Sequence, residues 1–210
     1  SVVESNAERI ASLMDILTRH EFDEDFLRKK VISQVFVALK EREGFKSGIN
    51  LVIEKAEVVK PILDILFKRG IGKNLVQKHI LSRLFDESET LESFTAYLAV
   101  LRKRVDSAAP LAKELKEYGI GESLILESVI TRIFDPTDPL DKLTADVSVL
   151  RAKGAAASPL IAALKAAGVG WRSIEAKVTR RVFDYAETAQ DYARHISALT
   201  RLMEISGVLL

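Results

Sequence analysis

A four-residue signature recurs three times at one fixed spacing, and this spacing constrains the fold more than any other feature. It reads Arg83-Leu84-Phe85-Asp86, then Arg132-Ile133-Phe134-Asp135, then Arg181-Val182-Phe183-Asp184. Each Phe follows the previous one by 49 residues, and one more step back reaches Phe36. A fixed period of about 20–50 residues is typical of repeat architectures, in which each unit buries its apolar face on its neighbours.

Setting the copies in phase divides nearly all of the 210 residues into four units of 49 residues. They are copy one (12–60), copy two (61–109), copy three (110–158) and copy four (159–207), and residues 1–11 remain as an N-terminal cap. We expect an all-α fold in which 1–210 form a single domain. It should be a helical-repeat solenoid of the armadillo or HEAT type, with three helices in each copy and a handedness that the sequence leaves open.

Proline and glycine mark the expected first helix of each copy. Proline suits the first helical position, where its missing N–H leaves nothing unpaired, and glycine tolerates the left-handed conformation that often follows a helix. The helix should therefore begin at Pro61, Pro110 or Pro159 and end at Gly70, Gly119 or Gly168. The following Gly-Ile-Gly segment is then a tight turn, since a phosphate-binding loop would need a preceding strand and more glycines.

The second helix carries an apolar stripe that ends at the signature Phe, so we interpret this Phe as a core residue. The Asp after it should cap the third helix, because Asp86 is followed by Glu89 as in a capping box, and copy four repeats the pattern. In copy three, Pro139 favours Asp138 as the cap. The signature Arg either pairs with a neighbouring copy or is solvated. A motif present in three copies is structural rather than catalytic.

The two ends of the chain depart from this pattern. Copy one lacks the capping Asp and contains Gly44 and Gly48, so its second and third helices should join differently, as in an atypical terminal repeat. The tail Val208-Leu209-Leu210 falls in phase with Pro159-Leu160-Ile161. We therefore expect the native chain to continue past Leu210.

Composition argues against several classes of function. The 31 basic and 30 acidic residues give a net charge of +1, which provides no global attraction to nucleic acid or anionic membranes. There is no cysteine, so disulfides and thiolate chemistry are excluded. No run of about 18 apolar residues predicts a membrane span. The chain should be soluble, and the absence of a targeting segment is the one feature that favours the cytoplasm.

The sequence shows no arrangement typical of a catalytic or metal site. His20, His79 and His195 occupy different phases of the repeat, so no two of them lie four residues apart on a helix, as in many zinc sites. The serines and threonines occupy cap-like or surface positions. We therefore expect no catalytic residue, no metal and no cofactor, and a protein that is not an enzyme.

Comparison among the copies singles out five large apolar residues at positions that are mostly polar in the other copies. They are Phe67, Tyr97, Tyr118, Leu126 and Trp171. Such positions should be exposed, and aromatic residues are frequent anchors of protein interfaces. Phe67, Tyr118 and Trp171 lie around the same kind of turn, so this edge is the preferred partner-binding region. The alternative is an incidental surface, because single exposed apolar residues are common.

Basic clusters leave nucleic acid as a less favoured partner. They are Arg28-Lys29-Lys30, Lys68-Arg69 with Lys73 and Lys78, Arg102-Lys103-Arg104, and Arg180-Arg181. A nucleic-acid groove would need these clusters aligned on one side, to supply the phosphate contacts that dominate affinity. Otherwise they are solvated faces.

The turn chemistry resembles that of the RecX family of recombination regulators. The best-matching stretches are residues 111–120 and 160–169, where a Leu-x-x-x-Gly-Ile type of turn precedes an apolar helix. Of the family's Gly-Tyr-Leu-Asp-Asp loop, only Phe134-Asp135 and Leu140-Asp141 stand near the matching place, and its strongly basic ends are missing. This resemblance implies binding to a RecA filament.

The sequence therefore predicts a non-catalytic scaffold or adaptor that binds a protein partner through an exposed helical surface. A RecX-like regulator and a nucleic-acid-binding helical repeat are the alternatives. The salt dependence of binding distinguishes the adaptor from the nucleic-acid-binding alternatives, because phosphate binding weakens steeply with salt and binding through an apolar patch does not.

Overall fold

The computed structural model describes residues 25–31, 44–86 and 88–207, together with Ala11, Met14, Asp15 and Thr18. These parts are helices joined by turns, with no strand among them, so the all-α prediction is confirmed. The expectations for Phe36, for the tail Val208-Leu209-Leu210 and for most of the N-terminal cap lie outside the described residues. The chain divides into two compact units, 1–102 and 103–210.

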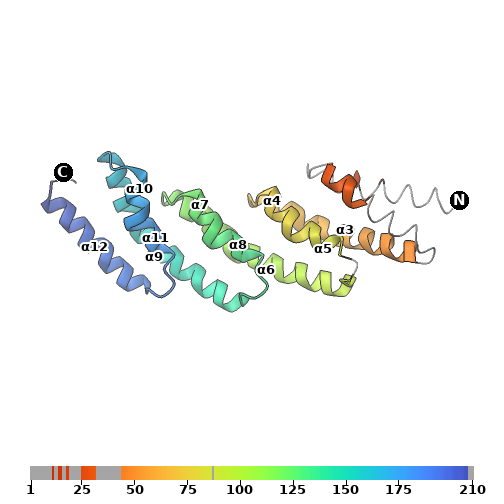
Figure 1. The fold of residues 1–210 in the computed structure, drawn as a ribbon. Helices are drawn as coiled ribbons and strands as arrows, with labels where there is room; N and C mark the ends of the chain where they lie inside the picture. The colour runs from red at the N-terminus through yellow and green to blue at the C-terminus, as the bar shows by residue number, and fades with distance from the viewer. Residues whose placement is uncertain are drawn as a thin grey trace. The chain divides into compact units, whose positions relative to one another are not determined.

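Long and short helices alternate along the chain (Figure 1). The long helices are α3 (Gly44–Lys68), α6 (Leu91–Glu117), α9 (Leu140–Ala166) and α12 (Ala189–Ile205). The short helices are α4 (Lys73–Val76) with η1 (Gln77–Leu81) and α5 (Ser82–Leu84), α7 (Glu122–Ile125) with η2 (Leu126–Ile130) and α8 (Thr131–Ile133), and α10 (Trp171–Ile174) with η3 (Glu175–Thr179) and α11 (Arg180–Val182). Each short helix therefore contains a π-helical turn, a wide turn that no sequence pattern predicted. The starts of α6, α9 and α12 are 49 residues apart.

The prediction that a helix begins at each recurring proline is wrong. Pro61, Pro110 and Pro159 lie inside α3, α6 and α9. An interior proline costs about 3 kcal/mol because it removes a helix hydrogen bond, so packing must hold these helices together. The buried stripe of α3 continues across the proline through Val52, Ala56, Val59, Leu63 and Leu66. The expected third helix of one copy and the first helix of the next are therefore one helix, and the three-helix copy is corrected to one long and one short helix per period.

The glycine turns after the long helices follow the prediction. Gly70, Gly119 and Gly168 have φ angles of 78°, 84° and 77°, a left-handed conformation that strains any other residue. After α3, the Ile71 N–H donates to the carbonyl of Leu66 at 2.9 Å, which closes a Schellman turn. This turn reverses the chain and starts the short helix.

The predicted capping boxes are wrong. The Asp86 carboxylate accepts a hydrogen bond at 2.9 Å from the backbone N–H of Ser88, two residues later, and so forms an Asx turn. The cap of α12 is Thr188, whose hydroxyl accepts the N–H of Asp191 at 3.1 Å. Glu89 and Glu187, the expected partners in the capping boxes, are not part of a cap, because each pairs with the signature Arg six residues before it.

These ion pairs recur in three copies and lie within each copy. They join Arg83 to Glu89, Arg132 to Asp138, and Arg181 to Glu187. In copy three the Arg132 Nε lies 2.9 Å from Asp138 Oδ2. Asp138 is therefore engaged by Arg132, and Pro139 rather than Asp138 stands at the cap position of α9. The signature Arg and its acid hold the loop that leads from the short helix into the next long helix.

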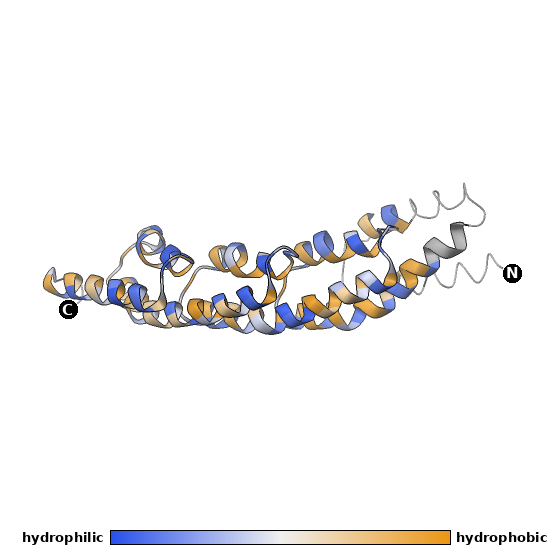
Figure 2. Cartoon of the chain, turned by 90° about the horizontal axis from the view of Figure 1, so that it is seen from below, coloured by the Kyte–Doolittle hydropathy of each residue, from blue (hydrophilic) through white to orange (hydrophobic). Residues whose placement is uncertain are grey.

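The helix α9 is the central element of the unit 103–210, with α12 and residues 171–182 packed against it. Within the described ranges, it alone is long and apolar enough to cross a membrane by length and composition, with a mean hydropathy of 1.3 over its most apolar window. Its apolar residues Leu150, Ile161 and Leu164 are buried in the fold. Figure 2 shows hydrophobic and hydrophilic residues interspersed along the helices. Packing inside the unit buries 44% of this most apolar window.

Candidate functional site

Four of the five residues singled out as exposed are half-buried. Leu126, the first residue of η2, is the exception, with 47% of its surface exposed. Phe67, Tyr97, Tyr118 and Trp171 are each partly covered. Phe67 and Tyr97 belong to the unit 1–102 and the other three to the unit 103–210, so the edge expected to combine Phe67, Tyr118 and Trp171 is divided between the two units.

Two of the aromatic rings lie against glycines. A Cβ added at Gly121 would lie 2.9 Å from Cζ2 of Trp171, and one at Gly154 would lie 2.8 Å from Cδ2 of Tyr118. The Lys165 ammonium also lies 5.1 Å from the centroid of the Trp171 ring, within cation–π range. The inference that polar equivalents mean an uncovered ring is therefore wrong for Trp171 and Tyr118, since each fills a space that a glycine leaves.

Tyr97 contacts the signature Arg of its own copy. The guanidinium carbon of Arg83 lies 3.8 Å from the centroid of the Tyr97 ring. One period later, Asp146 accepts a hydrogen bond from Arg132 at 2.8 Å. A cation–π contact in copy two thus takes the place of an ion pair in copy three.

A basic side chain is buried in each of the three long helices that cross a proline. Lys55, Arg104 and Lys153 are 49 residues apart and almost fully covered. The Lys55 ammonium donates to the carbonyl of Asp86 at 2.7 Å, and the Lys153 ammonium donates to that of Asp184 at 2.6 Å. These carbonyls follow the C-terminal end of a short helix, where a cation complements the helix dipole. Each cation therefore joins one copy to the signature turn of the next.

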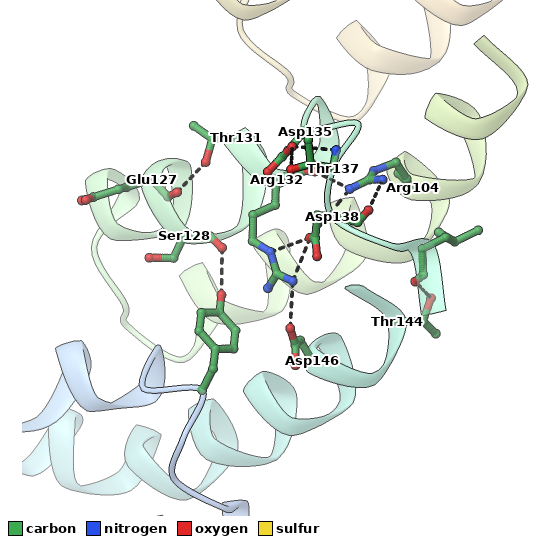
Figure 3. A network of polar contacts seen from close by, with 12 residues as sticks. Arg104, Glu127, Ser128, Thr131, Arg132, Asp135, Thr137, Asp138, Thr144 and Asp146 are labelled. Carbon is green, nitrogen blue, oxygen red and sulfur yellow. Dashed lines mark hydrogen bonds and ion pairs between the residues drawn. The ribbon is translucent and has the colours of Figure 1, made fainter. Parts of the chain in front are cut away.

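Arg104 makes the same connection through a larger network (Figure 3). It donates to the backbone carbonyls of Asp138 at 2.6 Å and of Arg132 at 2.9 Å. The Asp138 carboxylate lies between the two guanidinium groups, and Arg132 also reaches Asp146. The Tyr185 ring lies 4.8 Å from the Arg132 guanidinium. A polar pocket of about 310 Å³ adjoins this network. The interpretation of Arg104 as part of a solvated basic cluster is wrong.

Burial shifts the titration of these cations. Desolvation lowers the pKa of the Lys55 and Lys153 ammonium groups, and the nearby Glu89 and Glu187 oppose the shift. A lowered lysine pKa can mark a catalytic base. Here each ammonium donates to a backbone carbonyl and closes a packing contact, which is a structural role.

The described residues hold no group of three His, Cys, Asp or Glu side chains placed to bind a metal ion. Desolvation lowers the pKa of His79, and the nearby Lys78 lowers it further. Desolvation and the charge of Arg181 lower the pKa of His195. His20 lies outside the described residues.

An apolar groove of about 450 Å³ lies in the unit 103–210, between the second half of α9, residues 171–182 and α12. Its apolar lining includes Leu164, Val169, Val178, Leu199, Leu202 and Met203. Its charged and titratable lining residues are Lys177, Arg181 and His195, with no carboxylate among the lining residues. This composition suits an apolar ligand with negative charge at its edge.

The groove occurs where copy four is less covered than copy three. Val169 is half-buried, whereas its equivalent Ile120 is buried. Leu199 is half-buried, whereas its equivalent Leu150 is buried. The groove is therefore the face on which copy four would receive a further neighbour.

Sequence reasoning missed both the buried cations and the groove. A signal for the cations was present, because Lys55, Arg104 and Lys153 share one phase of the repeat. The fourth residue of that phase is Leu202, which lines the groove. A comparison of the copies at this position would have found both features, because three copies carry a basic residue there and copy four carries Leu202.

In comparisons with known proteins, the chain matches no protein family, no curated protein and no solved structure. Its function is therefore argued from the geometry of the sites.

Proposed function

We propose that the protein is a non-catalytic scaffold or adaptor, built as a helical-repeat solenoid of the armadillo or HEAT type, that binds a protein partner through an exposed helical surface. The recurrence of helix boundaries every 49 residues supports a solenoid. The cations Lys55, Arg104 and Lys153 support it further, because each joins one copy to the signature turn of the next. Neighbour-to-neighbour contacts of this kind stabilise repeat proteins.

The observation that carries the binding function is the apolar groove of copy four. Leu199, Leu202 and Met203 of α12 face a space that is closed in the preceding copy. Contiguous exposed apolar surface marks interaction sites, because leaving it in water is unfavourable. An extended helical surface with an apolar groove is suited to holding another polypeptide.

Three arginines near the signature turns are engaged within the fold, whereas the clusters Arg28-Lys29-Lys30, Lys68-Arg69 and Arg102-Lys103 are exposed. Arg104 is buried, Arg132 is paired with Asp138 and Asp146, and Arg181 is paired with an acid of its own copy. Nucleic-acid binding depends on cations that can neutralise phosphates, and these three arginines are already engaged.

Affinity capture from a native lysate, with and without nuclease, tests this function. We expect a protein that stays bound after nuclease treatment and when salt is raised from about 50 to about 200 mM, a change that weakens phosphate-dominated binding by orders of magnitude. If the captured proteins are lost after nuclease treatment and at the higher salt concentration, the proposal is contradicted. This loss would point to nucleic acid, or to a filament formed on it.

A further inference from the structure

We propose that the groove formed by α9, residues 171–182 and α12 is the docking site for an amphipathic helix of a partner protein, with an apolar face and an acidic flank. This inference rests on the proposed adaptor function and specifies its partner. Three observations on copies three and four carry it.

The first observation is the way copy three is covered. Ile161, in the second half of α9, lies over the turn at Gly119, with its Cγ2 3.1 Å from a Cβ added there. At Gly168, one period later, no described atom lies within 4 Å of an added Cβ, and the same is true of Gly70 in copy two. What sets copy four apart is the next residue, because Val169 is half-buried whereas Ile71 and Ile120 are buried. The contacts at the turn of Gly119 are made by one helix, through Ile161 and through Lys165, whose Nζ lies 3.3 Å from the same added Cβ. A helix is therefore the occupant that fits the equivalent surface of copy four, and the apolar lining of the groove calls for apolar side chains on the helix face that enters it.

The second observation concerns Leu202. Its equivalents Lys153 and Arg104 are buried cations that bind backbone carbonyls of the next copy. Leu202 cannot make such a bond, and 63% of its surface is exposed. The surface of α12 is therefore suited to an apolar side chain at this point and not to the carbonyl end of another signature turn. This distinguishes a partner helix from a further copy of the same repeat.

The third observation is the charge of the groove. Lys177 and His195 line it in copy four, and their equivalents in copy three are Ser128 and Asp146. The change from Ser and Asp to Lys and His makes the open surface more basic than the closed one. Acidic residues flanking the apolar face of the ligand would complement it and steer its approach.

Helix-in-groove recognition uses apolar anchors at i, i+3, i+4 and i+7. The probe is therefore a fluorescein-labelled model peptide with Leu at these positions and Glu beside them. It has about 20 residues, because isolated helices shorter than about 12–15 residues are marginal in water. A twin peptide carries Lys in place of every Glu. Fluorescence anisotropy with the full chain measures the affinity of each peptide.

We expect the acidic peptide to bind more tightly than its basic twin, by about fivefold for each favourable rim pair at most. Leu202→Glu should weaken binding of the acidic peptide by about tenfold or more, because it places a charge in the apolar contact. Lys177→Glu should reduce or reverse the preference between the twins. The matched control is Leu126→Glu, which adds the same charge at an exposed leucine outside the groove and should leave the affinity unchanged.

Three outcomes would overturn the docking site. In the first, the acidic and basic peptides bind the native chain with equal affinity, and Leu202→Glu changes neither affinity. Another is a loss of binding in Leu126→Glu and not in Leu202→Glu. The third is a dimer of the native chain, detected by light scattering, that Leu202→Glu dissociates, since the occupant would then be a second copy of the chain.

The two proposals fail in different ways. A nuclease-resistant partner captured from lysate that stays bound to Leu202→Glu would overturn the groove as its site and leave the adaptor function standing. In the converse case, nuclease removes all captured proteins while the chain still binds the acidic peptide through Leu202. This result would overturn the adaptor function and leave the groove as a helix-binding surface.

Discussion

Copies three and four follow the same sequence pattern and differ in what covers them. In copy three the turn at Gly119 and Gly121 is covered by Ile161 and Trp171. In copy four no described atom lies within 4 Å of a Cβ added at Gly168 or Gly170. Gly70 and Gly72 of copy two have equally few neighbours, so the difference in covering lies at the apolar positions, where Ile120 and Leu150 are buried and their equivalents Val169 and Leu199 are half-buried. The repeat pattern defines which face must be covered, and the neighbour decides whether it is.

The same contrast applies to charge. Lys153 is buried at the carbonyl end of a signature turn, whereas its equivalent Leu202 is exposed on the groove. A cation is used where the next copy supplies carbonyls, and an apolar residue stands where it does not. Substitutions at these positions test this difference, and their expected effects on stability decrease from Arg104 to Leu202.

Removing a buried cation should have the largest effect. Arg104→Ala removes the two hydrogen bonds that the guanidinium donates to the carbonyls of Arg132 and Asp138, whereas the Asp138 carboxylate keeps Arg132 as its partner. A hydrogen bond from a charged donor contributes about 1.5–3 kcal/mol, so losing both should cost about 3 kcal/mol or more. Urea unfolding measures the loss. The control is Arg102→Ala on the exposed side of the same helix, expected to stay within about 0.5 kcal/mol. Equal losses in both variants would show that Arg104 does not connect the copies.

Adding a methyl group to equivalent glycines should separate the two copies directly. Gly121 and Gly170 both stand at the cap position of a short helix, with φ of −66° and −61°. Gly121→Ala meets Trp171 at 2.9 Å and should cost about 1–3 kcal/mol through overpacking. It should also change the emission of Trp171. Gly170→Ala has no described neighbour within 4 Å and should stay within about 0.5 kcal/mol. A cost at Gly170 equal to that at Gly121 would refute the difference in covering.

The buried lysine of copy three should make a smaller, pH-dependent contribution. Burial lowers the pKa of Lys153 below the ordinary lysine value of 10.5. Below both pKa values, folded and unfolded chains carry the proton and the burial penalty is present in full. As the pH rises through the folded-state pKa toward 10.5, unfolding must take up a proton, so stability rises with pH in this window.

The measurement compares unfolding midpoints of the native chain and Lys153→Met between about pH 8 and pH 10, within the range where lysine pKa values vary in proteins. The stability of the native chain relative to Lys153→Met should increase with pH, because only the native chain carries this titration. The exposed Lys177→Met serves as the reference variant. A difference that stays flat or falls with pH would mean that Lys153 is not desolvated.

Restoring the cation in copy four should have the smallest effect. Leu202→Lys places a lysine at the phase of Lys153, where the described residues offer no signature turn to bind it. With 63% of Leu202 exposed, stability should stay within about 0.5 kcal/mol. Thermal unfolding checks this. A clear stabilisation would indicate that carbonyl groups do lie within reach of α12.

Much of the local structure could be predicted from the sequence. The glycine turns, the buried signature Phe85 and Phe134, and the apolar stripes of the short helices follow from backbone preference and periodicity. The helix starts at the prolines could not be predicted, since burial on both sides of Pro61 outweighs its local preference. The capping boxes failed for a related reason, because Glu89 finds a closer partner in Arg83.

The candidate site was harder to predict than the fold. Trp171 looked exposed because its equivalents are charged, but the glycine at position 121 provides the space that it fills. The groove exists because neighbouring elements bury the apolar residues of copy four less fully than those of copy three, and the repeat pattern does not predict this difference in burial. Leu202, the residue that breaks the phase of buried cations, was the one direct signal.

Hydrogen–deuterium exchange of the full chain, with and without the captured partner, tests the central claim most directly. The partner should slow exchange in α12, residues 171–182 and the second half of α9, the elements that line the groove. Exchange around Leu126 should not change. Protection centred on Leu126, or none in α12, would contradict the claim that the open face of copy four is the binding surface.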